Sequence, residues 1–372
     1  MATSTPQMRV LAACIESRVP ALLWGPPGIG KTATIEAHAA HWGMYCETIV
    51  GSYREPGDFL GMPHIVDGVV EYPPLSWLTK VNGAERALLF LDEFSTSPPS
   101  VQKAMLRILQ ERHVGEHRLN DSVSVIAAAN PPDVAVDGWA LDPPTANRFL
   151  HLTWESSSDE WLEGLASNFS AMPVHPLRDL TSPGTAAEQA AAAQKVTGFL
   201  AHRPDMREPG VPKGDDAAYG WASRRSWHNL ARVMGRLDRT DDVAIRLTAI
   251  GLLGEGTANE FMAWLHTADL ADPEAVLADP TIVDWSHERP DKLFALVSAV
   301  SGLAVLRGDE KSWTAGIEAL IACAEASKAD VAMAGMRSLM AAMPDGATVP
   351  RSARQAFSDL FQHTGAWSSA AA

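Results

Sequence analysis

The chain has 372 residues, of which 46% are hydrophobic and 20% charged, a composition typical of an ordinary globular protein with more than one domain. Its formal net charge of -15, from 30 basic and 45 acidic residues, disfavours a general nucleic-acid surface, because such surfaces neutralise phosphates. The three cysteines (Cys14, Cys46 and Cys323) are far apart, which indicates reduced thiols. The N-terminus lacks an apolar signal core, and the longest apolar stretch, residues 293–306, is too short to span a bilayer. We therefore expect a cytoplasmic protein without a membrane segment.

Short apolar runs alternate with helical patterns up to about residue 155, and this alternation predicts a parallel α/β sheet. Several runs are apolar at every position, as strands are when helices cover both of their faces. The predicted strands are Ala21–Trp24, Cys46–Val50, Ala87–Leu91, Val123–Ala129 and Phe149–Trp154.

The second half of the chain carries helical periodicity instead of strand patterns. A segment broken by prolines, residues 168–185, precedes it and reads as a linker or hinge. Two copies of Ala-Asp-Pro, seven residues apart at 271–273 and 278–280, predict two helix starts. The predicted helical segments are 186–202, 226–237, 241–254, 292–307, 313–326 and 330–343.

Residues 25–32 match the pattern of a phosphate-binding loop, with an apolar strand before the loop and a helical pattern after it. Glycines let backbone N–H groups close around phosphates, and the helix N-terminus adds its positive end. Lys31 is expected to reach the β- and γ-phosphates of a nucleotide, and the Thr32 hydroxyl to bind Mg²⁺. A Gly-Pro turn that binds nothing is the alternative. The predicted nucleotide-binding residues are Gly25, Pro26, Pro27, Gly28, Ile29, Gly30, Lys31, Thr32 and Asp92.

Polar side chains follow two further predicted strands. Asp92 and Glu93 end one strand and Asn130 follows the next, at the sheet edge where α/β proteins bind ligands. Asp92 suits a Mg²⁺ shell, Glu93 can polarise an attacking water, and Asn130 can orient that water. The alternatives are a solvated acidic turn and an Asn-Pro turn. The adjacent carboxylates favour hydrolysis, because small-molecule kinases do not need Glu93.

Two arginine sites complete the set. Arg148 stands just before the last predicted strand, and Arg224 and Arg225 stand at a helix start. Cations placed near a γ-phosphate stabilise the charge that develops during phosphoryl transfer. Stacking on the neighbouring aromatic residues, Phe149 and Trp227, or simple surface charge remains the alternative.

In order, the segments GPPGIGKT, LLFLDEFS, AAAN, NRF and SRRSW resemble the Walker A, Walker B, sensor 1, arginine-finger and sensor 2 elements of AAA+ ATPases. Within that superfamily the chain resembles the MoxR branch, because residues 54–78 are similar to its helix-2 insert and residues 104–130 to its pre-sensor hairpin and sensor strand. The resemblance runs from about residue 20 to 236. The sequence departs from the branch where DEFST replaces a segment like DEINR, and where Arg224 replaces a proline.

The resemblance implies an α/β AAA+ core with a parallel five-stranded sheet, followed by a helical lid and an all-helical extension. It implies three domains: a nucleotide-binding domain at 1–165, a lid carrying sensor 2 at 180–270 and an extension at 271–372. The implied cofactors are ATP and Mg²⁺, with Thr32 and Asp92 on the metal. The implied catalytic residues are Glu93, Asn130, Arg148 as a finger acting on a neighbouring subunit, and Arg225 in the lid, although Arg224 stays open for that role.

The family architecture implies a ring, usually a hexamer, with ATP at each subunit boundary. Our leading hypothesis is a Mg-dependent ATPase that remodels a protein partner in a chaperone-like way, and the MoxR resemblance implies a partner of the von Willebrand factor A type. A nucleic-acid motor or loader is the second hypothesis, which the acidic balance disfavours. A nucleotide-gated scaffold with little turnover is the third.

Overall fold

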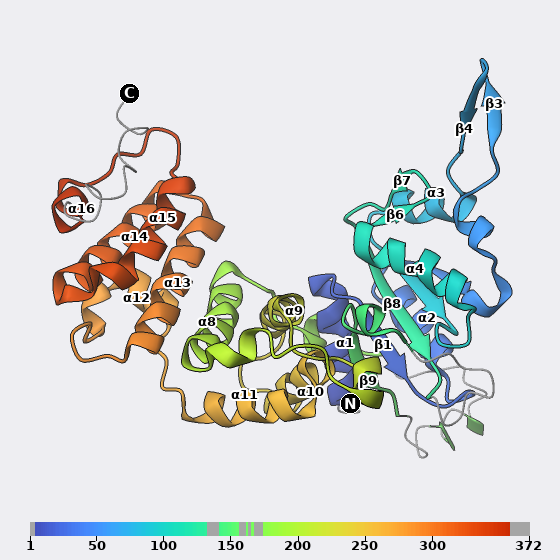
Figure 1. The fold of residues 1–372 in the computed structure, drawn as a ribbon, viewed down its shortest axis with the longest axis horizontal. Helices are drawn as coiled ribbons and strands as arrows, with labels where there is room; N and C mark the ends of the chain where they lie inside the picture. The colour runs from blue at the N-terminus through green and yellow to red at the C-terminus, as the bar shows by residue number, and fades with distance from the viewer. Residues whose placement is uncertain (1–3, 132–140, 156–160, 163–164, 167–173, 358–372) are drawn as a thin grey trace. The chain divides into compact units, whose positions relative to one another are not determined.

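The computed structural model describes residues 4–131, 141–155, 161–162, 165–166 and 174–357. The chain divides into two compact units (Figure 1). The first, the α/β unit, is drawn from residues 1–183 and 208–260, and the second, the helical unit, from residues 184–207 and 261–372. The linker predicted at 168–185 is described only from residue 174 onward.

A five-stranded sheet organises the α/β unit. Its strands, in spatial order, are β2 (Tyr45–Val50), β5 (Ala87–Asp92), β8 (Val123–Ala129), β1 (Ala21–Trp24) and β9 (Leu150–Thr153). All neighbouring strands are parallel, and Leu22 of β1 lies opposite Ala127 of β8 and His151 of β9. Strands β1, β5 and β8 are buried along their length except at Asp92. The predicted α/β class with a parallel five-stranded sheet is therefore confirmed.

Helices connect these strands and bury the sheet. The apolar core includes Leu89 of the sheet, Met105 and Phe94, whose ring meets that of Phe149 edge-on at 5.3 Å. The helices of this unit are α1 (Pro6–Ser17), α2 (Lys31–His41), α3 (Ser76–Gly83), α4 (Pro99–Glu111), α5 (Pro143–Ala146), α7 (Leu177–Leu180), α9 (Arg224–Met234) and α10 (Asp242–Leu253), with short 3-10 turns at η1 (Gly51–Tyr53), η2 (Pro56–Phe59) and η4 (Gly214–Ala218).

Two antiparallel hairpins stand outside the sheet. The first pairs β3 (His64–Val66) with β4 (Val69–Glu71), and the second pairs β6 (His113–Val114) with β7 (His117–Arg118). The β3–β4 hairpin projects from the α/β unit (Figure 1), and Ile65 and Val69 on it are 79% and 62% exposed. The pre-sensor hairpin that the resemblance implies within residues 104–130 corresponds to the second of these.

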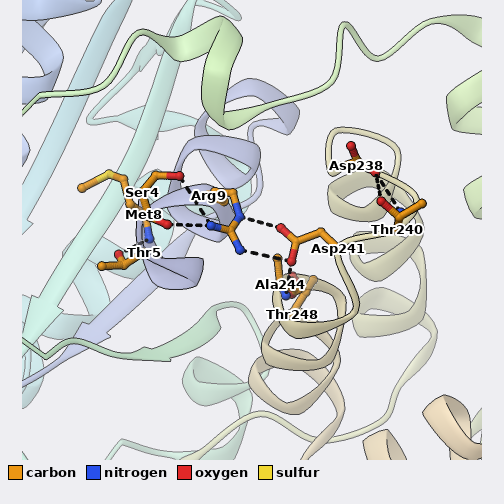
Figure 2. Close-up of polar contacts among 9 residues, drawn as sticks. All are labelled: Ser4, Thr5, Met8, Arg9, Asp238, Thr240, Asp241, Ala244 and Thr248. Atoms are coloured by element: carbon orange, nitrogen blue, oxygen red, sulfur yellow. Dashed lines mark hydrogen bonds and ion pairs between the residues drawn. The ribbon is translucent and has the colours of Figure 1, made fainter. Parts of the chain in front are cut away.

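Helices α9 and α10 pack against the α/β core, and α10 lies on β9. A Cβ atom on Gly251 of α10 would lie 2.3 Å from the carbonyl oxygen of His151, so only glycine permits this approach. Arg9 of α1 binds Asp241, the N-cap of α10, through Nε–Oδ2 at 2.5 Å and Nη2–Oδ1 at 3.2 Å (Figure 2). The Asp241 carboxylate also accepts the backbone N–H of Ala244 at 3.1 Å, so one side chain both caps α10 and holds α1.

The helical unit is built around its own apolar core, which includes Val297, Trp313 and Leu320. Helix α8 packs on α13, and the Gln194 amide donates to the Ala271 carbonyl at 2.9 Å. The elements of this unit are α8 (Ala186–His202), η3 (Pro204–Arg207), α12 (Pro273–Ala278), η5 (Pro280–Ile282), α13 (Pro290–Arg307), α14 (Glu310–Cys323), the π-helix η6 (Ala324–Lys328), α15 (Ala329–Ala341) and α16 (Arg351–Ala356).

The two units do not follow the three predicted domains. The predicted lid, residues 180–270, is split between them: residues 208–260 belong to the α/β unit and residues 184–207 to the helical unit. The division also falls inside helix α11 (Glu255–Thr267), between Glu260 and Phe261. The physical reason is packing, because α9 and α10 bury their apolar faces against α1 and β9, whereas α8 buries its face against α13. No helix among the described residues is long and apolar enough to cross a membrane.

Candidate functional site

The phosphate-binding loop joins β1 to α2. Gly28 and Gly30 have φ of 82° and 86°, a left-handed conformation that side chains disfavour. Gly25 is needed for a different reason: a Cβ atom there would lie 2.6 Å from Ile29 Cδ1 and 2.8 Å from the Trp154 carbonyl oxygen. The loop therefore requires glycine at three positions, two for conformation and one for close packing.

Lys31 begins α2 and is 8% exposed. Its ammonium donates to the carbonyl oxygens of Gly25 at 2.6 Å and Pro26 at 3.0 Å, and to Asn130 Oδ1 at 3.3 Å. Burial lowers the pKa of Lys31, and the charge of Asp92 opposes that shift. Lys31 is thus a buried cation held at the loop, where a phosphate can replace its carbonyl partners.

Thr32 and Asp92 meet at the next position. The Thr32 hydroxyl donates to Asp92 Oδ2 at 2.6 Å, which joins the start of α2 to the end of β5. Hydroxyl and carboxylate oxygens are the donors that Mg²⁺ prefers, and such sites usually complete the shell with water and substrate phosphates. The two predicted metal ligands are therefore together, and their chemistry fits Mg²⁺.

Glu93 has φ of 56°, a left-handed conformation that costs a residue with a side chain roughly 1–2 kcal/mol. Its backbone N–H donates to Asp92 Oδ1 at 2.8 Å, and its carbonyl accepts the N–H of Ser97 at 3.1 Å. Its carboxylate accepts a hydrogen bond from the hydroxyl of Ser52, in the turn η1 after β2. Strained backbone of this kind clusters at functional sites, and here it occurs at the residue directly after β5.

Ser95, which follows this pair, ties the acidic turn to the neighbouring strand. Its hydroxyl donates to the Asn130 carbonyl and accepts the Asn130 N–H, both at 3.2 Å. The N–H of Phe94 also donates to the Ala128 carbonyl at 2.8 Å. The serine in the unusual DEFST segment therefore positions Asn130, whose side chain reaches Lys31.

The predicted arginines form a second group. Arg148 Nη2 donates to Gln110 Oε1 at 2.7 Å, and Nη1 donates to the Pro144 carbonyl. Burial, together with the positive charge of Arg225, lowers the pKa of Arg148. Arg224 instead pairs with Glu208, with Nε–Oε1 at 2.8 Å. Within the described residues, no hydrogen bond or ion pair connects Arg148 or Arg225 to the phosphate loop.

A buried histidine lies beside both groups. His151 on β9 is 8% exposed, and its ring lies 6.0 Å from that of Trp24 and 5.9 Å from that of Tyr219. Burial lowers the pKa of His151 to about 4, while its hydrogen bond to the Ala146 carbonyl opposes the shift. His151 is therefore neutral at physiological pH.

A cavity of about 780 Å³ opens next to the phosphate loop, within the α/β unit. Its size lies within the range of about 300–1,000 Å³ typical of small-molecule sites. Aromatic side chains and the first residues of the loop share its wall. The lining includes Trp24, Gly25, Pro26, His151, Tyr219 and Trp221.

The structure brings together four of the predicted site residues through direct hydrogen bonds, namely Lys31, Thr32, Asp92 and Asn130. Glu93 joins them through its N–H bond to Asp92. Sequence reasoning missed Ser52, whose position after a strand carries no distinguishing pattern. It also missed His151 and the cavity, because their neighbours come from segments distant in the chain.

A known family matches the segment that carries this site. The family model for the AAA domain of the dynein-related subfamily matches residues 20–149, a segment that contains the loop, the acidic pair, Asn130 and Arg148. No curated protein matches the sequence. Among solved structures, a protein from Cytophaga hutchinsonii described as a "putative ATPase" is 19% identical, with 70% of this chain and 88% of that chain covered and a TM-score of 0.45.

Proposed function

We propose that the chain is an AAA+ ATPase that hydrolyses ATP in a Mg²⁺-dependent reaction, and the AAA-domain family model that matches residues 20–149 supports this. One observation carries the proposal: the contact of Thr32 with Asp92, 2.6 Å long, lies beside the buried Lys31 and the acidic Glu93. A phosphate-binding loop without hydrolysis needs no carboxylate at the position of Glu93.

The site residues have distinct roles in this proposal. Lys31 binds the β- and γ-phosphates, and its three contacts already hold the ammonium at the loop. Thr32 and Asp92 would hold Mg²⁺, and the ion would supply positive charge that neutralises the phosphates. Glu93 accepts a proton from the attacking water, and Asn130 orients that water. Because Ser52 occupies the Glu93 carboxylate in this conformation, Glu93 has to exchange that hydrogen bond for one to water.

The aromatic cavity is the proposed nucleoside site. It begins at Gly25 and Pro26, so a nucleotide with its phosphates in the loop can extend into it. The rings of Trp24 and Tyr219 lie 5.6 Å apart at a 52° tilt and offer stacking surface to a base. We expect Tyr219→Ala to weaken ATP binding without changing the site residues on the loop.

Arg148 and Arg225 are proposed to act on ATP bound at a subunit boundary. Arg148 has no described contact with the loop of its own chain, which favours action on a neighbouring copy, as the family resemblance implies. Arg225 is the better sensor candidate, because Arg224 is engaged by Glu208 whereas Arg225 is close enough to Arg148 to lower its pKa. This arrangement requires self-assembly, for which we propose a hexameric ring.

We propose that ATP hydrolysis drives chaperone-like remodelling of a protein partner, in the manner of MoxR-type ATPases. The exposed apolar residues of the β3–β4 hairpin support a protein partner, because contiguous exposed apolar surface marks interaction sites. A von Willebrand factor A-type protein is one such proposed partner. The net charge of -15 disfavours nucleic acid as the main substrate of the ATPase.

Two variants test hydrolysis separately from binding. Lys31→Ala is expected to lose ATP binding, whereas Glu93→Gln is expected to bind ATP but release no phosphate. Normal phosphate release by Glu93→Gln would refute the role of Glu93. Affinity purification of Glu93→Gln with ATP from the native host then tests which macromolecule the ATPase acts on. A protein that copurifies supports remodelling, and nuclease-sensitive nucleic acid contradicts it.

A further inference from the structure

Both ring nitrogens of His151 are engaged by groups from different parts of the chain. Trp24 Nε1 donates to His151 Nδ1 at 2.8 Å, and His151 Nε2 lies 2.8 Å from the Ala146 carbonyl oxygen. Because a carbonyl accepts only, the ring proton sits on Nε2, and because an indole N–H donates only, Nδ1 is the acceptor. The two bonds therefore fix one tautomer and one ring orientation.

The two partners of His151 border the functional residues. Trp24 is the last residue of β1, directly before Gly25 of the phosphate loop, and Ala146 ends α5 just before Asn147 and Arg148. His151 thus connects the root of the loop to the segment that carries the predicted finger. A displacement of either end therefore acts on a ring that both bonds hold.

Asn147 extends the connection toward α9. The residue is 5% exposed, and its side-chain amide donates to the Trp221 carbonyl at 2.7 Å, while Asn147 Oδ1 accepts from the Ser223 hydroxyl at 2.8 Å. Ser223 is the N-cap of α9, the helix that begins with Arg224 and Arg225. The two arginine sites therefore share one hydrogen-bonded support, which we call the His151 network: Trp24, Ala146, Asn147, His151 and Ser223.

The proposed nucleoside cavity touches the same network. Trp24, His151 and Trp221 line it, and the ring of Tyr219 lies against both Trp24 and His151. A base in the cavity would pack against His151, which holds the Ala146 carbonyl, and against Trp221, whose carbonyl accepts a hydrogen bond from Asn147. Occupancy of one nucleotide site and orientation of the two arginines thus depend on common side chains.

We infer that His151 is a positioning residue that orients Arg148, through Ala146, relative to the phosphate-loop strand, and that Asn147 extends this support to Arg225. This inference rests on the proposed ATPase function. It assigns the essential bond to Nε2 and the Ala146 carbonyl, since that bond holds the finger segment. The bond from Trp24 orients the ring.

Conservative variants separate the two bonds. A glutamine amide reaches the position of Nε2 and can donate to Ala146, whereas asparagine offers an acceptor near Nδ1 and reaches only Trp24. We expect His151→Gln to keep kcat within about twofold, and His151→Asn and His151→Phe to lower it at least about tenfold, since small misplacements of catalytic groups reduce rates strongly. Because His151 also lines the proposed nucleoside cavity, the KM for ATP is expected to change in all three variants, so kcat is the readout that separates them.

Trp313→Phe is the matched control. It also removes one buried hydrogen bond to a carbonyl, from Trp313 Nε1 to Leu339 at 2.7 Å, but in the helical unit, and it is expected to leave kcat unchanged. Equal kcat in all three His151 variants, or higher kcat in His151→Asn than in His151→Gln, would overturn the inference. Asn147→Ala provides an independent route if His151 variants fold poorly, and an unchanged kcat in that variant would also overturn it.

Mixing of subunits distinguishes this inference from the proposed function. Arg148→Ala mixed with Lys31→Ala should recover activity if the finger acts on a neighbour. His151→Phe should then recover activity with Lys31→Ala, which donates intact fingers, and not with Arg148→Ala. Recovery only with Arg148→Ala would place the defect in the phosphate loop and overturn the inference. If Arg148→Ala mixed with Lys31→Ala recovers no activity, the hypothesis that Arg148 acts on a neighbouring subunit is refuted. The order of kcat among the His151 variants then still decides the role of His151.

Discussion

Acidification should destabilise the α/β unit through His151 before the ring is protonated in the folded state. Burial lowers its pKa from an ordinary 6.5 to about 4. Between pH 6.5 and pH 4 the unfolded chain binds a proton at His151 that the folded protein does not bind. The free energy of unfolding therefore falls as the pH falls from 6.5 toward 4, and the His151 contribution stays constant below pH 4. At 1.36 kcal/mol per unit, the loss attributable to His151 is about 2 kcal/mol between pH 7 and pH 5.

The comparison with His151→Gln isolates that contribution. Glutamine does not titrate, and every other ionisable group is common to both proteins, so their effects cancel in the difference. Urea unfolding followed by tryptophan fluorescence at pH 7 and pH 5 gives the free energy of unfolding of each protein. We expect wild type to lose about 2 kcal/mol more than His151→Gln over this interval. An equal loss in both proteins would refute the buried, neutral His151 on which the network depends.

Three further variants test separate parts of the structure. Thr32→Val removes the proposed Mg²⁺ ligand at similar volume; we expect phosphate release to fall at least about a hundredfold, and Mg²⁺-stimulated turnover like that of wild type would contradict the assignment. Ser52→Ala frees the Glu93 carboxylate, so basal turnover is expected to rise severalfold, and a fall would show that Ser52 assists catalysis instead. Arg9→Ala removes the two bonds to Asp241 and should lower the free energy of unfolding by about 1–2 kcal/mol, with a smaller difference at high salt; no change in urea midpoint would contradict a role for this pair in joining α1 to α10.

Local patterns predicted the elements that local physics determines. Strand Val123–Ala129 and helix Ala186–His202 have the predicted bounds, because each combines a clear periodicity with a sharp stop or cap. The phosphate loop, Asp92 and Asn130 were also predictable, since the carboxyl ends of parallel strands share one edge. Because Thr32 and Asp92 both lie at that edge, their hydrogen bond is consistent with the prediction.

Features that depend on distant packing were beyond the sequence patterns. The sequence pattern of α8 predicts a helix, but it does not show that this helix packs against α13 instead of the α/β core. The choice between Arg224 and Arg225 depends on Glu208, sixteen residues away, which pairs with the first. His151 reads as an ordinary strand residue until Trp24 and Ala146 are placed around its ring.

The central claim is that ATP is hydrolysed at a site shared between subunits. The most direct test is to measure phosphate release by an equal mixture of Arg148→Ala and Lys31→Ala subunits. Each variant alone is expected to be inactive, because one lacks the finger and the other lacks the phosphate-binding lysine. Random assembly pairs an intact loop with an intact finger at about a quarter of the boundaries, so we expect up to about a quarter of wild-type phosphate release. Absence of activity at every mixing ratio, with assembly of the mixture verified, would contradict the shared site.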